Sequence, residues 1–329
     1  MIKKPNIAVI IGGDSSEFEV SIKSGDNIFR AIDTKKYTPW LVRMKGKEWK
    51  ILQNGKEIAD IDKSDFTFSY PGEKVYFDFA YITIHGTPGE DGVLQGYFDL
   101  MKIPYSTSNL HSSSLTFNKW FCNNYLRCFG IKMGRSVLIE KDENPDEKEI
   151  IKELGLPVFV KPHAGGSSFG ITKVKNRKEL YPALIKAWKE SRGAIVEEFI
   201  EGAEYTCGLV KLKNEKLIFP LTEVIPRNEF FDYEAKYTPG VTEEITPARL
   251  PDNMAERCRQ LSSRIYDLCR CSGIVRVDYI LNNGEFYFLE VNITPGMTDT
   301  SFIPQQIKAM GLTLKEVISR VIEEKLKQV

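Results

Sequence analysis

Cysteine and histidine are scarce in this chain, and their spacing matches neither a CxxC motif nor a structural zinc site. Six cysteines and three histidines occur in 329 residues. No two cysteines form a CxxC pair, and none stands at zinc-site spacing with a histidine. Scattered cysteines are typical of reduced, cytoplasmic proteins, so we expect free thiols, no structural zinc site and a cytoplasmic location.

The chain also lacks excess charge and long apolar runs. Its 45 Lys and Arg residues balance its 45 Asp and Glu residues, so no global field attracts nucleic acid or an anionic membrane. The apolar run 7–12 follows two lysines, but glycines end it too early for a signal peptide. No stretch reaches the roughly 18 apolar residues of a membrane-spanning helix. We therefore expect neither nucleic acid nor membrane as a partner.

Two common nucleotide-binding fingerprints are missing as well. Neither "GGDSSE" after the first apolar run nor "KPHAGGSSFG" contains GxGxxG, and no GK[ST] follows the glycines. This excludes an NAD-dependent reductase of the usual kind and a P-loop enzyme. The glycines of 165–170 favour a phosphate-binding loop only weakly, since glycine-rich hairpins are commonly simple turns.

The order of apolar patterns predicts an α/β protein with an α+β C-terminal part. Strands are expected at 6–13, 37–44 and 76–86, with helices at 15–32 (capped by Ser15 or Ser16) and 92–103. This alternation of strands and helices indicates a parallel N-terminal α/β domain over 1–107. Residues 108–150 have a helical pattern, followed by strand, glycine-rich loop, strand, helix and strand, which indicates a second domain over 108–197. A hairpin-rich antiparallel sheet, with a long polar and aromatic loop at 226–251, forms a third domain over 198–329.

A predicted hairpin near the C-terminus carries the residues best suited to a metal. Side chains alternate along a strand, so Arg276 shares a face with Asp278, and Glu290 shares one with Asn292. Two carboxylates and an amide suit Mg²⁺, and Leu289 and Val291 are expected to pack on the other face of their strand. The alternative is that all four polar residues face solvent on an amphipathic sheet.

The register of this hairpin decides whether the two pairs share one face. A plain two-residue loop at Asn283–Gly284 would pair Asp278 with Leu289 and separate it from Glu290. A three-residue loop or a bulge would pair Asp278 with Phe288 and Arg276 with Glu290. The metal-site hypothesis therefore requires a loop with an odd number of residues, a bulge near the turn, or ligands beyond the paired region.

Six ordered segments, spread over nearly the whole chain, resemble the D-alanine–D-alanine ligase family of the ATP-grasp superfamily. They are "GGDSSEFEVSIKSG", "HGTPGEDGVLQGYFDLMKIPY", "KPHAGGSSFG", "EEFIEGAEYT", "FFDYEAKY" and "RVDYILNNGEFYFLEVNITPGMTDTSFIPQ". The resemblance implies a three-domain ATP-grasp fold, a cytoplasmic homodimer, and ATP held between the second and third domains. It also implies the reaction. One D-alanine carboxylate attacks the γ-phosphate of ATP, and the amine of a second D-alanine attacks the acyl phosphate, which yields a dipeptide for peptidoglycan synthesis.

The resemblance also implies roles for individual residues. The metal ligands are Asp278, Glu290 and Asn292, which hold two Mg²⁺ ions, with Mn²⁺ as an alternative. Arg276 and the backbone N–H of Gly296 stabilise the oxyanion. The ATP-binding residues are Lys119, Lys161, Gly166, Ser168, Glu197, Glu198, Phe199, Ile200, Glu204 and Lys236. Glu17 holds the first ammonium with Ser167 and Tyr237, Ser301 binds the second carboxylate, and His85 lies near the substrates.

Two departures from the family pattern concern the substrates. His163, Ala164 and Gly165 stand where many members carry longer polar side chains, and Phe302 replaces a common leucine beside the second amino acid. Lys236 and Tyr237 favour D-alanine over D-lactate or D-serine as acceptor. The open alternatives are an ATP-grasp ligase with a different acceptor and a non-catalytic nucleotide-binding module, although Arg276 and Asn292 argue against the latter. The sequence does not identify the base that deprotonates the incoming amine.

Overall fold

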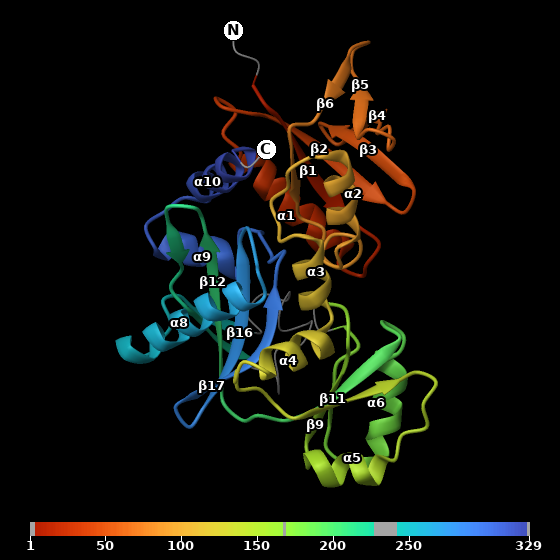
Figure 1. The fold of residues 1–329 in the computed structure, drawn as a ribbon, viewed down its shortest axis with the longest axis vertical. Helices are drawn as coiled ribbons and strands as arrows, with labels where there is room; N and C mark the ends of the chain where they lie inside the picture. Colours follow the sequence, from red (N-terminus) through yellow and green to blue (C-terminus); the bar gives the residue numbers. More distant parts are fainter. Residues whose placement is uncertain (1–3, 167–168, 227–241, 328–329) are drawn as a thin grey trace.

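The computed structural model describes residues 4–166, 169–226 and 242–327, which form three successive main β-sheets (Figure 1). The first sheet has the strand order β4-β3-β2-β1-β7. Its strands are β1 (Asn6–Gly12), β2 (Thr38–Lys45), β3 (Glu48–Gln53), β4 (Lys56–Asp60) and β7 (Phe79–Ile82). A small hairpin of β5 (Thr67–Ser69) and β6 (Lys74–Tyr76) precedes β7. The strand β1 is parallel to β2 and β7, as expected, but β3 and β4 extend the sheet in antiparallel fashion, which the sequence did not reveal.

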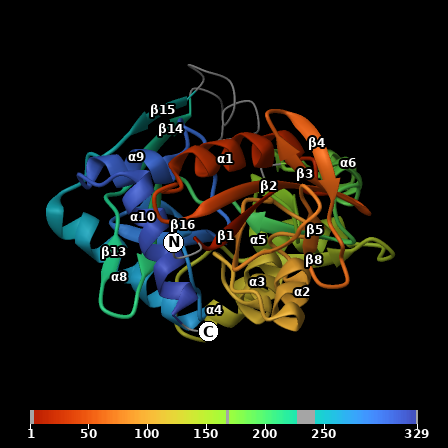
Figure 2. The same cartoon turned by 90° about the horizontal axis from the view of Figure 1, so that it is seen from above.

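Alternate residues of β1 pack into two different cores, which explains its unbroken apolar run. Ile7 and Val9 lie in one core with α1 (Phe18–Ala31) and α10 (Leu314–Leu326), whereas Ala8 and Ile10 face α2 (Val93–Met101). The last helix of the chain therefore returns to the first sheet. Seen from above, α9 (Phe302–Ala309) and α10 lie beside α1 (Figure 2).

The start of α1 differs from the prediction of a serine cap. Its N-terminal capping residue is Glu17, and no side chain caps the helix by a hydrogen bond. The hydroxyl of Ser15 instead donates to the carbonyl oxygen of His85 at 2.7 Å and accepts from the N–H of Glu17 at 3.2 Å. Ser15 thus ties the loop after β1 to the loop after β7, and it brings Glu17 and His85 close together.

The second sheet is antiparallel, with the order β10-β9-β11-β8. It follows α3 (Leu110–Phe117) and α4 (Lys119–Arg127) and consists of β8 (Ser136–Glu140), β9 (Val158–Pro162), β10 (Thr172–Val174) and β11 (Gly193–Glu198). The helices α5 (Glu147–Leu154) and α6 (Leu180–Ala187) share its core, and a short 3₁₀ helix at Arg177–Glu179 directly precedes α6. The strand β8 lies inside the segment expected to be helical, because five residues are too few for periodicity to separate strand from helix.

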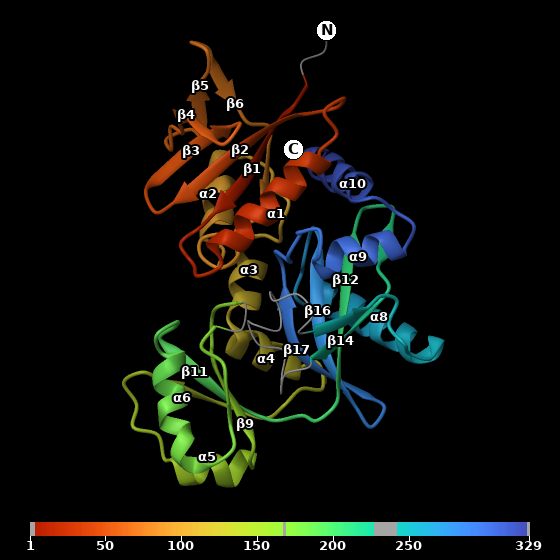
Figure 3. The same cartoon turned by 180° about the vertical axis from the view of Figure 1, so that it is seen from behind.

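The third sheet has the order β15-β14-β12-β16-β17, with β13 paired to β12. Its strands are β12 (Ala203–Lys211), β13 (Lys216–Ile218), β14 (Thr222–Pro226), β15 (Thr242–Ile245), β16 (Val275–Asn282) and β17 (Glu285–Asn292). One face packs against α8 (Asp252–Leu268) and α4 through residues such as Val277 and Tyr279. Alternation therefore turns Arg276 and Asp278 to the opposite face, where they line a cavity together with residues of the second sheet. Seen from behind, β9 and β11 of the second sheet lie below and to one side of β16 and β17 (Figure 3).

The hairpin of β16 and β17 satisfies the register condition by a bulge. Asn283 and Gly284, both at positive φ, form a two-residue turn that pairs Asn282 with Glu285. Tyr279 still opposes Phe288, but Asp278 opposes Glu290, so Leu289 is the extra residue. The expected pairing of Asp278 with Phe288 is wrong, and Arg276 opposes Asn292 rather than Glu290. The shared face that the hypothesis required is nevertheless present.

Candidate active site

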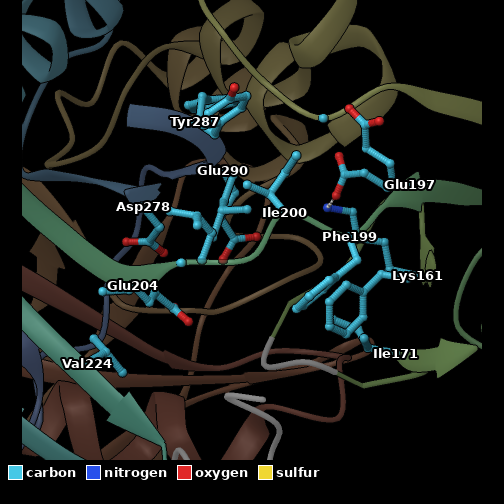
Figure 4. A pocket seen from close by; sticks show the side chains of 18 of the residues that line it. Lys161, Ile171, Glu197, Phe199, Ile200, Glu204, Val224, Asp278, Tyr287 and Glu290 are labelled. Atoms are coloured by element: carbon cyan, nitrogen blue, oxygen red, sulfur yellow. Dashed lines mark hydrogen bonds and ion pairs between the residues drawn. The ribbon is translucent and has the colours of Figure 1, made fainter. Parts of the chain in front are cut away.

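A cavity of about 470 Å³, called here the first cavity, lies between the second and third sheets (Figure 4). Apolar side chains of both sheets line it, among them Phe159, Ile171, Phe199, Val224 and Ile280. Ten sequence-predicted residues line the same cavity: Lys119, Lys161, Glu197, Glu198, Phe199, Ile200, Glu204, Arg276, Asp278 and Glu290. An apolar cleft of this volume with charged groups at its wall suits a nucleotide base and its phosphates.

Lys161 and Glu197 form a buried ion pair at the wall of the first cavity. The Lys161 ammonium donates to Glu197 at 2.6 Å, and both side chains are only about a tenth exposed. They come from neighbouring antiparallel strands, where Lys161 opposes Ile195, two residues before Glu197. Glu198, by contrast, accepts from the backbone N–H and the guanidinium of Arg135, at 2.8 and 2.6 Å.

A second ion pair in the first cavity has no counterpart in the sequence analysis. Arg249 donates to both carboxylate oxygens of Glu223, at 2.9 and 3.0 Å. The arginine holds the pKa of Glu223 below its ordinary value. Residues 26 positions apart become neighbours only through the pairing of β14 with β15, so no local pattern could indicate this pair.

The three proposed metal ligands cluster where β16 and β17 pair. Asp278 opposes Glu290 directly, and the Asn292 amide lies 3.1 Å from Asp278 and 3.4 Å from Glu290. Arg276 donates to both oxygens of Asp278 at 2.8 and 2.7 Å, and Thr206 donates to it at 2.6 Å. These contacts stabilise a carboxylate that is only 6% exposed.

This donor set fits a hard cation such as Mg²⁺, which takes carboxylate and amide oxygens. Half a turn of the Asn292 amide would present its oxygen to the same space, and amide orientation is assigned from hydrogen bonds. Within the described residues, no three His, Cys, Asp or Glu side chains form a metal cluster. A metal here would therefore be held by two carboxylates and an amide, with substrate oxygens completing its coordination.

Lys119 connects these ligands to the glycine-rich loop. It is the first residue of α4, and its ammonium lies 3.3 Å from Glu290 and donates to the carbonyl oxygen of Gly165 at 2.8 Å. Gly166 lies directly over Glu17, because a Cβ at Gly166 would stand 2.4 Å from a Glu17 carboxylate oxygen. The loop thus covers the acid expected to bind the first amino acid, and a side chain at position 166 would displace the Glu17 carboxylate.

A smaller cavity of about 110 Å³, called here the second cavity, adjoins the first, since Arg276 and Glu290 line both. The sequence-predicted residues Glu17, His85, Gly166, Asn292, Gly296, Ser301 and Phe302 line it, together with Glu90 and Glu244, which were not predicted. Its size and polar lining suit small charged molecules rather than a nucleotide.

Ser301, Gly296 and Phe302 form the C-terminal wall of the second cavity. The Ser301 hydroxyl accepts from the N–H of Thr298 at 3.0 Å, and a Cβ on Gly296 would lie 2.9 Å from it. The ring of Phe302, the first residue of α9, lies 5.4 Å from the Arg276 guanidinium carbon, within cation–π distance. Phe302, which departs from the family pattern, therefore contacts Arg276 directly.

His85 and Glu90 form the N-terminal wall of the second cavity. Burial lowers the pKa of His85 despite the opposing charge of Glu17, so the imidazole is neutral near pH 7. One oxygen of Glu90 accepts from the N–H of Gly86 at 2.7 Å, and the other lies 4.0 Å from His85 Nδ1. Burial, and then repulsion by Glu17, raises the pKa of Glu90 to about 8. Burial also raises the pKa of Glu244, whose carboxylate accepts from Gln305 at 2.6 Å.

Four sequence-predicted site residues lie outside the described residues: Ser167, Ser168, Lys236 and Tyr237. The others all line one of the two cavities. None of the helices in the described ranges is both long and apolar enough to cross a membrane.

The nucleotide-sized cavity between two antiparallel sheets meets a small polar cavity at Arg276 and Glu290, which agrees with the ATP-grasp enzyme that the six sequence segments predict. Family models for the N-terminus and C-terminus of D-ala D-ala ligase match residues 6–108 and 126–323. The chain belongs to the D-alanine–D-alanine ligase family.

Individual relatives match over their full length. The D-alanine–D-alanine ligase of Phocaeicola vulgatus is 51% identical over 323 residues, covering 98% of this chain and 99% of the relative. That of Parabacteroides distasonis is 51% identical over 325 residues, covering 98% of each. Among solved structures, the VanG D-Ala:D-Ser ligase of Enterococcus faecalis has a TM-score of 0.86 at 31% identity, covering 98% of this chain and 100% of that one. The Bacillus anthracis D-alanine–D-alanine ligase complexed with ATP has a TM-score of 0.78 at 29% identity, covering 98% of each.

Proposed function

We propose that this protein joins two D-alanine molecules through an acyl-phosphate intermediate, with hydrolysis of ATP to ADP and phosphate, and so supplies a peptidoglycan precursor. The meeting of the two cavities at Arg276 and Glu290 carries the proposal, because a phosphoryl group must pass between a nucleotide and a small carboxylate there. Identity of about 50% to D-alanine–D-alanine ligases favours D-alanine as acceptor over the D-serine named for the more distant VanG structure.

The first cavity holds ATP in this proposal. Its apolar end, near Phe199 and Ile200, takes the adenine, and Glu204 binds the ribose. Lys119 and Lys161 contact the phosphates, together with the glycine-rich loop. Asp278, Glu290 and Asn292 hold two Mg²⁺ ions, which would neutralise charge on the phosphate oxygens.

The second cavity holds the amino acids. Glu17 binds the ammonium of the first D-alanine, and Ser301 binds the carboxylate of the second. Arg276 and the backbone N–H of Gly296 stabilise the charge that develops on the oxygens in both steps, and such preorganised donors often supply the largest catalytic contribution. His85 closes the wall beside the ammonium. Ser167, Lys236 and Tyr237 keep the roles that the family resemblance implies.

The proposal extends to organisation and location. We assign three domains at 1–107, 108–197 and 198–329, each containing one of the three main sheets, and we expect a cytoplasmic homodimer. Sedimentation equilibrium would test the dimer.

Product analysis tests the function directly. Purified protein with ATP, Mg²⁺ and D-alanine should release phosphate and form D-alanyl-D-alanine, identified by mass spectrometry, and D-lactate or D-serine added as competitor should give little mixed product. Phosphate release only after addition of a different amino or hydroxy acid would reject D-alanine as acceptor. Nucleotide binding without any release would favour a non-catalytic binding module.

A further inference from the structure

The second step of the proposed reaction needs a proton acceptor, a role that has been assigned to no residue so far. The second D-alanine arrives as an ammonium ion, whose nitrogen has no lone pair for attack on the acyl phosphate. Five side chains that line the second cavity can accept a proton: Glu17, His85, Glu90, Glu244 and Glu290. Glu17 is assigned to the first ammonium and Glu290 to the metal, which leaves His85, Glu90 and Glu244.

Glu90 has a geometry suited to this role. It lies in the loop between β7 and α2, on the wall of the second cavity, with 12% of its side chain exposed. The Gly86 N–H holds one carboxylate oxygen at 2.7 Å and fixes the orientation of the group. The other oxygen lies at 4.0 Å from His85 Nδ1, beyond hydrogen-bonding distance. One oxygen is therefore anchored, and the other can approach a nitrogen in the second cavity.

The charges around Glu90 make its protonation depend on the first substrate. Glu17, Glu290, Lys119 and His85 face it from four different segments. Burial is the main cause of its raised pKa of about 8, and repulsion by Glu17 is the next. An ammonium bound to Glu17 would cancel that repulsion and lower the pKa of Glu90. Binding of the first D-alanine would thus deprotonate Glu90 before the second amine reacts, and a base with a pKa near the working pH transfers protons most effectively.

We propose that Glu90 is the catalytic base that accepts a proton from the ammonium of the second D-alanine. The Glu90 carboxylate takes one proton and leaves a neutral amine, whose lone pair forms the C–N bond to the acyl-phosphate carbon. The C–O bond to phosphorus-bound oxygen then breaks, and phosphate leaves with that electron pair and takes a second proton from the nitrogen. The amide keeps the third proton, and Glu90 releases its own to solvent when product leaves. This inference rests on the proposed function.

The two rival groups are less well placed. The Gln305 amide donates to one oxygen of Glu244 at 2.6 Å, and both this hydrogen bond and the charge of Arg276 oppose the rise in the pKa of Glu244, which makes its carboxylate a weaker base. His85 Nε2 lies 3.5 Å from the Ser24 hydroxyl, on the side away from Glu90, and burial disfavours the imidazolium that a base would become. Both rivals enter the test as separate variants.

The test compares two nucleophiles in Glu90→Gln. Glutamine has nearly the same shape and keeps a carbonyl oxygen for the Gly86 N–H, but it cannot accept the proton. Hydroxylamine is largely neutral near pH 7 and needs no base to attack the acyl phosphate. We expect E90Q to lose about 100-fold or more in D-alanyl-D-alanine kcat, the range for general-base catalysis, while D-alanine hydroxamate and ADP form within about 3-fold of wild type. Glu48→Gln, at an exposed position of β3, should match wild type in both assays.

Each other outcome has a defined meaning. Equal losses with D-alanine and hydroxylamine would show that Glu90 only maintains the site, and wild-type dipeptide formation by E90Q would also overturn the proposal. Selective loss in Glu244→Gln or His85→Gln, but not in E90Q, would assign the base to that residue instead. Failure of the wild type to form either hydroxamate or ADP from D-alanine would refute the proposed function itself.

The pH dependence gives a second readout that a structural role would not change. The base must be deprotonated, so wild-type dipeptide kcat should fall as pH drops through the pKa of Glu90 in the complex. Hydroxamate formation should not show this fall, and E90Q should lose it for the dipeptide. An unchanged acidic limb in E90Q would contradict the proposal.

Discussion

The buried pair of Lys161 and Glu197 allows a quantitative test of how the wall of the first cavity is held together. Replacing Lys161 with methionine keeps most of the side-chain volume. Among the described residues, the Glu197 carboxylate then keeps only the Asn123 amide, at 3.5 Å, as a side-chain partner. Breaking a buried ion pair from one side typically costs about 3–5 kcal/mol, because a charge remains buried without compensation. Replacing both partners by neutral groups of similar size costs much less, so the K161M/E197Q double variant should recover most of the loss.

Hydrogen–deuterium exchange of peptides from β9 and β11 is the appropriate assay, since it reports local opening of the second sheet rather than unfolding of the whole chain. Each 1.4 kcal/mol is a factor of ten, so K161M should speed exchange there by about two to three and a half orders of magnitude. Peptides of β1 and β2 should be unaffected. Lys178 is an exposed lysine in the 3₁₀ helix after β10 and serves as the control position. In Lys178→Met, the free energy of local opening should stay within about 0.5 kcal/mol of wild type. If the double variant loses the sum of both single losses, the two residues are not coupled and the reasoning fails.

Three further substitutions test the residues at the junction of the cavities. Arg276→Ala should lower dipeptide kcat at least 100-fold, the scale for losing an oxyanion donor, while the Kd of a non-hydrolysable ATP analogue stays within a few-fold; comparable turnover would refute its role. Asn292→Ala should raise the Mg²⁺ concentration for half-maximal activity at fixed ATP, and an unchanged metal titration would count against ligation. Phe302→Leu removes a ring 5.4 Å from Arg276, a contact of about 0.5–2 kcal/mol, so kcat should fall by roughly 2- to 30-fold and D-serine should compete better with D-alanine. An unchanged D-serine to D-alanine product ratio would show that the ring does not shape the acceptor site.

Local sequence patterns predicted the elements whose burial leaves a continuous or periodic run of apolar residues. The run Ile7–Ile11 predicts β1, because a strand covered on both faces needs apolar residues at every position. The strands β3 and β4 escaped prediction because they extend one side of the first sheet and only Ile51 among their residues is buried, so they carry no continuous apolar run. The strand β8 escaped because it is short and only one of its residues is fully buried.

The site residues that the sequence missed depend on long-range pairing. Glu90 lies in a motif quoted for its resemblance, but its pKa is raised by burial and then by the approach of Glu17, which comes from the loop after β1. Glu223 and Arg249 meet through the edge strands of the third sheet. Composition and periodicity describe each segment separately, whereas a perturbed pKa requires that two segments meet.

The bulge at Leu289 shows most clearly what a sequence pattern leaves open. Alternation correctly places Arg276 beside Asp278 and Glu290 beside Asn292, but it says nothing about how the two strands align. The Asn283–Gly284 turn, taken alone, would set Asp278 opposite Leu289 and point the two carboxylates to opposite faces. One extra residue in β17 reverses that outcome and leaves Leu289 at the wall of the first cavity instead of in the core. A bulge disrupts the ladder locally and persists where burial on both sides of it favours the shifted register. Here Phe288 and Val291 are both buried against α8 and α4, on either side of Leu289, so packing of the apolar face fixes the alignment of the polar one.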